Sequence, residues 1–224
     1  MQTPIGRRLN DSTRSQVIAC VIGVCAVAGD LILVWWNHYP ESNESRWVLA
    51  GLVLVMYLHL VRGDLASLGL TGKPVQGWGY WVCATLVIGL AVLCCIGVGA
   101  ALVLLLGRQW PVYTIPPGSV GTSFLVMCLF APVSEETIYR LALCVPFAGL
   151  SRPWTTIVVS GVVFGGLHVV SGNPSPENLV GGLFLAWAYL KSGTIYLPIV
   201  LHSLGNFIAW VGQVAAWYWL HGYV

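Results

Sequence analysis

A short charged segment inside an apolar run governs how the rest of this chain is interpreted, and it reads Phe130-Ala131-Pro132-Val133-Ser134-Glu135-Glu136-Thr137-Ile138-Tyr139-Arg140. It lies within residues 123–148, a mostly apolar run that is long enough to cross a membrane. Each ionised side chain at the centre of a bilayer costs about 2.5–3.5 kcal/mol on insertion scales. A membrane span does not need that cost in order to fold, so we expect the two carboxylates and the arginine to be functional.

The composition places the chain among helical membrane proteins. Apolar residues make up 57% and charged residues 8% of the 224 positions, whereas charged residues make up about 25% of a typical soluble domain. The sequence does not show the alternating segments of about 10 residues that are typical of a membrane β-barrel. We therefore predict a single integral membrane domain over residues 1–224, an all-α bundle surrounded by the lipid bilayer. The net charge of +2 gives no reason to expect nucleic-acid binding.

Seven apolar runs are predicted to cross the membrane, or eight if the last run breaks near Gly212. The first is interpreted as a retained signal anchor and not as a cleaved signal peptide, because apolar sequence continues well beyond Ala28. Its arginine-containing head predicts a cytoplasmic N-terminus in a plasma-membrane protein that crosses the bilayer several times. The runs cover residues 17–36, 47–61, 80–106, 123–148, 154–170, 179–190 and 195–220.

Three local features of these spans lead to structural expectations. Pro132 has no N–H group to donate, so we expect it to kink the fourth span one turn before Glu135. The carbonyl freed there needs a protein or water partner, which predicts a polar cavity. Asp30, near the far end of the first span, is interpreted as an interfacial or packing residue. Gly161 and Gly165 in the fifth span are expected to let a neighbouring helix come close.

Three later spans carry polar side chains that helical spacing places on common faces. Glu136 and Arg140 are four residues apart, so we expect them to form an ion pair. Glu135 is rotated by about 100° from its neighbour and can point into a cavity instead. The polar set in these spans consists of Glu135, Glu136, Arg140, His168, His202 and Asn206.

These polar faces predict one shared site, because side chains of this kind must turn inward and meet when lipid surrounds the bundle. A carboxylate, two imidazoles and an amide can together activate a water and stabilise an oxyanion, as peptide hydrolysis requires. Intramembrane acids and histidines also serve proton relays, so a proton-coupled transporter is one alternative. A non-catalytic membrane scaffold is another. No internal repeat of the transporter kind is visible in the sequence, and the completeness of the polar set argues against a scaffold.

The spacing of the polar residues resembles that of the CAAX-processing and bacteriocin-processing (CPBP) family of intramembrane proteases, which includes the type II CAAX prenyl endopeptidases. The family pattern is Glu-Glu-xxx-Arg, then Phe-xxx-His, then His-xxx-Asn or His-xxx-Asp. All three motifs occur here in that order, and the resemblance covers about residues 122–208, the predicted protease core. The matches are Glu135-Glu136-xxx-Arg140, Phe164-xxx-His168 and His202-xxx-Asn206.

This resemblance implies an intramembrane endopeptidase, which would hydrolyse a peptide bond in a membrane-associated peptide or a lipidated protein. The substrate would be of the CAAX type or the leader-peptide type. Glu135 then corresponds to the general base acting on the attacking water, and His168 to the residue that helps to hold this water. His202 and Asn206 correspond to the pair that stabilises the oxyanion.

The resemblance also implies supporting residues and leaves the cofactor open. Glu136 and Arg140 correspond to an ion pair that orients the helix, and Phe164 packs beside the histidine. The family is commonly labelled as metalloproteases, and two histidines with a carboxylate form a donor set that zinc or another divalent metal can take. Because the sequence has no His-Glu-xx-His motif, we favour a glutamate-based hydrolysis without a metal.

Overall fold

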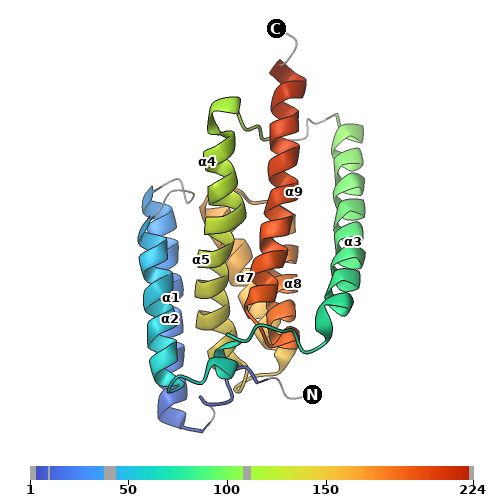
Figure 1. Ribbon diagram of the computed structural model, residues 1–224. Helices are drawn as coiled ribbons and strands as arrows, with labels where there is room; N and C mark the ends of the chain where they lie inside the picture. Colours follow the sequence, from blue (N-terminus) through green and yellow to red (C-terminus); the bar gives the residue numbers. More distant parts are fainter. Residues whose placement is uncertain (1–3, 10, 38–43, 108–111, 222–224) are drawn as a thin grey trace.

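The computed structural model describes residues 4–9, 11–37, 44–107 and 112–221 (Figure 1). In these ranges the chain is helical and contains no strand, and its long helices run alternately up and down as a bundle. The predicted all-α bundle is therefore confirmed. The long elements are α1 (Thr13–Asn37), α2 (Glu44–Leu60), α3 (Gly77–Leu105), a composite helix from α4 to α6, α7 (Pro153–Val170), α8 (Pro176–Ser192) and α9 (Tyr196–His221).

Five of the helices in the described residues are long and apolar enough to cross a membrane by themselves. The other two, α2 and α8, have 17 residues each and are about 25 Å long, at the lower limit for a span. The seven predicted runs thus correspond to seven helical stretches of the described chain. The alternative of an eighth helix is wrong, because α9 continues without a break through Gly212.

The composite helix contains two wide turns. It is built from α4 (Val120–Phe124), a π-helical segment at Leu125–Phe130, α5 (Ala131–Tyr139), a second π-helical segment at Arg140–Cys144, and α6 (Val145–Phe147). A π turn shifts the backbone hydrogen bond from the fourth to the fifth residue, and such turns are frequent at functional sites. The two π segments enclose α5, the element that carries the acidic pair.

Pro132 explains the first of these wide turns. In the π register the carbonyl of Met127 would accept a hydrogen bond from residue 132, but proline has no N–H group to donate. The side-chain amide of Asn206 on α9 donates to this carbonyl instead, at 2.7 Å. Ser134 likewise donates its hydroxyl to the carbonyl of Phe130, at 3.0 Å. The expected distortion therefore takes the form of a π segment, and protein groups provide the partners for its carbonyls.

Small residues bring α7 and α8 into close contact. A Cβ atom added to Gly161 would lie 2.6 Å from Cδ2 and 2.8 Å from the backbone nitrogen of Leu183. One added to Gly165 would lie 3.2 Å from Cα of Leu179. The close approach predicted from these two glycines is thus confirmed, and it places Phe164 of α7 in the interior of the bundle, where its ring is buried.

The α1–α2 hairpin packs against α5, as the blue helices of Figure 1 show. Val34 and Ala50 from the hairpin are buried together with Ile138 and Tyr139 of α5. The ring of Trp47 makes an edge contact with the ring of Phe130, with centroids 5.6 Å apart. In contrast, α3 contacts the bundle mainly near its start, through the buried Trp81. The hairpin therefore lies beside the acidic segment although it is distant in sequence.

We predict that Gly161→Ala destabilises the protein, because the new methyl group collides with the backbone and side chain of Leu183. Overpacking of this kind costs about 1–3 kcal/mol. Gly166→Ala on the same helix is the matched control, since a Cβ there has no heavy atom within 4 Å. Thermal unfolding in detergent, followed by circular dichroism, should show a lower midpoint for Gly161→Ala only. Equal midpoints for the two variants would contradict the close packing of α7 on α8.

Candidate active site

Glu136 forms a buried ion pair with Arg140, one turn later on the same helix. Nε of Arg140 donates to Oε2 of Glu136 at 2.6 Å, and Nη2 donates to Oε1 at 3.1 Å. Neither side chain has any exposed surface. Nη1 of the arginine donates to the hydroxyl of Ser160 on α7 at 2.6 Å. The ion pair predicted from the spacing is therefore confirmed, and it also joins the acidic helix to α7.

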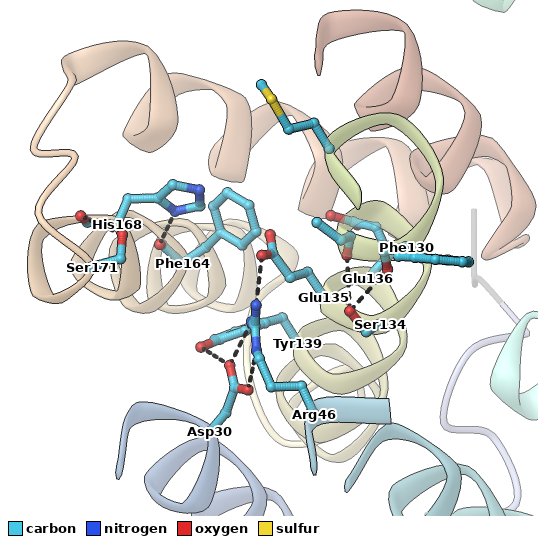
Figure 2. A network of polar contacts seen from close by, with 12 residues as sticks. Asp30, Arg46, Phe130, Ser134, Glu135, Glu136, Tyr139, Phe164, His168 and Ser171 are labelled. Carbon is cyan, nitrogen blue, oxygen red and sulfur yellow. Dashed lines mark hydrogen bonds and ion pairs between the residues drawn. The ribbon is translucent and has the colours of Figure 1, made fainter. Parts of the chain in front are cut away.

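Glu135 points away from this pair, toward α2 (Figure 2). Its Oε1 accepts a hydrogen bond from Nη1 of Arg46 at 3.1 Å. The same guanidinium holds Asp30 with two further bonds, from Nε to Oδ1 at 2.7 Å and from Nη2 to Oδ2 at 2.9 Å. The hydroxyl of Tyr139 donates to Oδ2 of Asp30 at 2.9 Å. Four side chains from α1, α2 and α5 therefore form one connected polar network.

The structure corrects the interpretation of Asp30 and adds Arg46, which the sequence analysis did not include. Asp30 is fully buried and carries two ionic hydrogen bonds, so it is neither interfacial nor an ordinary packing residue. A carboxylate inside a span requires a partner of opposite charge. This requirement could have pointed to a basic partner for Asp30 in the sequence. Arg46 was missed because it comes one residue before the predicted second span, where an arginine is usually exposed to the membrane surface.

His202 lies between the two glutamates. Its Nδ1 is 3.0 Å from Oε1 of Glu136, and its Nε2 is 3.9 Å from Oε2 of Glu135. A carboxylate can only accept, so Nδ1 carries the proton of the first contact. The second separation is too long for a direct hydrogen bond and suits a bridging water. The imidazole thus joins α9 to both carboxylates of α5.

His168 stands on the far side of the Phe164 ring from Glu135, as Figure 2 shows. Its Nδ1 is 3.0 Å from the carbonyl oxygen of Phe164, so Nδ1 donates and Nε2 is left as an acceptor. The ring of Phe164 contacts both imidazoles, with centroids 4.7 Å from His168 and 5.6 Å from His202. Phe164 is therefore the apolar residue around which the two histidines are arranged.

Asn206 lies at the border of the cluster. Within the described residues it makes no hydrogen bond to either glutamate. It lies one turn beyond His202 on α9, and its amide nitrogen donates a hydrogen bond to the carbonyl of Met127. One N–H and the amide oxygen of this side chain remain for other partners. The structure thus joins Glu135, Glu136, Arg140, Phe164 and His202 through a chain of contacts into one cluster. His168 joins them through Phe164, and Asn206 joins them through the π segment.

A catalytic zinc ion needs three protein side chains that are directed at one point. Among the described residues, no three His, Cys, Asp or Glu side chains are placed to hold one together. Oε1 of Glu135 is engaged by Arg46, and Nδ1 of His202 by Glu136. Within the part of the chain that the structure describes, this arrangement therefore gathers no set of three metal ligands.

Fold and site together define a membrane protein of several spans with a polar, charge-paired centre. Residues 117–208 match the family model described as type II CAAX prenyl endopeptidase Rce1-like. The match covers less than half of the chain, and it confirms the resemblance to CPBP proteases that the three motifs carry. An uncharacterized protein of Mycoplasma capricolum subsp. capricolum is 35% identical over 100 residues, 42% of this chain. The chain spans about 29% of the length of that relative. No solved structure matches this chain.

We predict that Arg140→Met strongly destabilises the fold, because it leaves the carboxylate of Glu136 buried without its guanidinium. Removing one partner of a buried ion pair costs about 3–5 kcal/mol. Arg152→Met, at an exposed position before α7, is the control and is expected to change stability by less than about 0.5 kcal/mol. The measurement is thermal unfolding in detergent.

The double variant Glu136→Gln/Arg140→Met refines this test. It removes both charges of the pair, so it should unfold at a higher temperature than Arg140→Met alone. If Arg140→Met is as stable as the control, the ion pair does not carry the structural role assigned to it.

Proposed function

We propose that the protein is an intramembrane endopeptidase in which Glu135 is the general base. One observation carries this proposal: the two oxygens of this carboxylate have different surroundings. Oε1 is held by Arg46 at 3.1 Å, whereas Oε2 faces Nε2 of His202 across 3.9 Å. A water between Oε2 and the imidazole would be within hydrogen-bond reach of both atoms. The other carboxylate, that of Glu136, has both oxygens occupied by Arg140 and His202.

The reaction proceeds by addition of this water to the peptide carbonyl. As the water oxygen bonds to the carbonyl carbon, one water proton passes to Oε2 of Glu135, and the carbonyl π electrons move to the carbonyl oxygen. When the C–N bond of the tetrahedral intermediate breaks, the proton on Glu135 passes to the leaving nitrogen. The products are a carboxylic acid and an amine, and the glutamate is a carboxylate again.

His202 is assigned the main role in stabilising the oxyanion. The buried network holds three carboxylates, those of Asp30, Glu135 and Glu136, against two guanidiniums, which leaves one excess negative charge. In this role His202 acts with a proton on both ring nitrogens, so that Nδ1–H donates to Glu136 and Nε2–H is directed toward the oxyanion. Asn206, one turn away, is assigned the second donor, and His168 the task of holding the water from the other side of Phe164.

The proposed substrate is a membrane-associated peptide of the CAAX type. The family of residues 117–208 supports this class, since its description is that of a CAAX prenyl endopeptidase. The buried position of the site supports a substrate that reaches it from within the membrane. A leader peptide is the alternative substrate that the sequence motifs allow.

The proposed orientation has the N-terminus in the cytoplasm, with the protein in the plasma membrane. Seven of the ten Lys and Arg residues lie near helix ends on the same side of the bundle as the N-terminal segment, because successive long helices alternate in direction (Figure 1). Short loops rich in Lys and Arg stay on the cytoplasmic side. These seven residues are Arg7, Arg8, Arg14, Arg62, Lys73, Arg152 and Lys191.

The proposal predicts that Glu135→Gln abolishes cleavage without loss of the fold. The assay uses the purified full chain in proteoliposomes and an internally quenched, farnesylated CAAX peptide as the probe. Because the amide cannot accept the proton of the water, we expect a rate lower by about 100- to 10,000-fold. Glu177→Gln, which changes an exposed carboxylate at the start of α8, should cleave like the wild type. A folded Glu135→Gln protein that still cuts the peptide would remove the mechanism.

Metal independence is a separate part of the proposal and has its own test. Cleavage of the same peptide should be unchanged after prolonged treatment with a strong chelator, since Glu135 and His202 are engaged by protein partners and not arranged around an ion. Zinc added afterwards should not raise the rate. Loss of activity on chelation and its return with zinc would replace the glutamate-based reaction with a metal-dependent one.

A further inference from the structure

We infer that Arg46 is a positioning residue for Glu135, and that the α1–α2 hairpin thereby forms part of the active site. This inference rests on the proposed role of Glu135 as general base. It goes beyond the family match, because that match begins at residue 117 and includes neither Arg46 nor Asp30. The three motifs likewise contain neither residue.

The geometry of the guanidinium carries the inference. Nε and Nη2 bind the two oxygens of Asp30 side by side, at 2.7 and 2.9 Å, which fixes the plane of the group. With that plane fixed, the two N–H bonds of Nη1 have fixed directions, and Oε1 of Glu135 accepts a hydrogen bond from this nitrogen at 3.1 Å. Oε2 is then directed toward His202. Arg46 therefore determines which oxygen of the general base is free to take a proton.

A closed ring of contacts supports the same assignment (Figure 2). Glu135 contacts Arg46, Arg46 contacts Asp30, and Asp30 accepts a hydrogen bond from Tyr139. Glu135 and Tyr139 are four residues apart on α5, so the ring returns to the face of the helix from which it started. The rotation of α5 about its axis is thereby set relative to the hairpin.

A purely structural role does not require the contact with Glu135. The hairpin already packs on α5 through Val34 and Ala50, and through the ring of Trp47 against that of Phe130. Asp30 and Arg46 also balance each other in charge without a third partner. The additional bond to Glu135 instead holds one oxygen of that glutamate, while its other oxygen faces His202.

The test compares variants of the full chain in proteoliposomes, with the quenched, farnesylated CAAX peptide as the probe. The principal variant is Asp30→Asn/Arg46→Gln, which removes both charges of the pair and so avoids a buried, unpaired aspartate. Arg46→Lys is the conservative variant, because it keeps the charge but not the planar fork. Arg62→Gln, at an exposed arginine just after α2, is the control. Thermal unfolding is measured for every variant.

We expect the neutral pair to fold and to lower kcat by about 10- to 100-fold, since a displacement of about 1 Å at a reacting group can cost about 100-fold. KM should stay near that of the wild type, because Arg46 does not face the substrate. Arg46→Lys should recover part of the lost kcat, and Arg62→Gln should match the wild type. Recovery by lysine separates positioning of the glutamate from simple packing.

Three results would overturn the inference: a folded neutral pair with the kcat of the wild type, a change confined to KM, or a neutral pair that fails to fold. The last result would make the pair a structural element of the bundle only. Failure of the proposed function is distinguishable from these, because it would show as no cleavage by the wild type or as full activity of Glu135→Gln.

Discussion

The pairing of charges inside a lipid-surrounded bundle is the constraint on which the rest of the structure depends. Water outside the helices cannot solvate these groups, so each must find a partner inside the bundle. Arg140 joins α5 to α7 through Ser160, His202 joins α9 to α5, and Arg46 joins the hairpin to α5. Lipid offers no hydrophobic force between helices, so close packing at small residues such as Gly161 accompanies these polar contacts. The polar centre thus helps to position the helices relative to one another.

The two glutamates show how one residue type takes two roles in adjacent positions. A rotation of about 100° along the helix directs Glu136 toward Arg140 and Glu135 toward Arg46. Glu136 is bound at both oxygens, whereas Glu135 is bound at one, and its other oxygen is the one to which the proposed mechanism assigns the proton. A π segment lies on either side of α5, and wide turns of this kind are frequent at functional sites.

The sequence was sufficient for the fold class and for the residues that helical spacing connects. The ion pair of Glu136 with Arg140 and the contact of Phe164 with His168 follow from positions four apart on one helix. Contacts between helices that are distant in the chain do not follow from spacing. The bond from Asn206 to the carbonyl of Met127 depends on how α9 is placed beside a π segment. Arg46 was missed for the same reason, because its partners Asp30 and Glu135 are 16 and 89 positions away.

The family match and the charge network of the site cover different parts of the chain. Residues 117–208 contain every group that the mechanism assigns to water, proton and oxyanion. They do not contain the cation that holds Glu135 from the other side, because Arg46 comes from α2 and is itself fixed by Asp30 of α1. The matched segment alone would carry Glu135 and Glu136 beside the single guanidinium of Arg140. The hairpin brings the cation of Arg46 together with a carboxylate of its own, so it holds Glu135 by a hydrogen bond without adding net charge to the network.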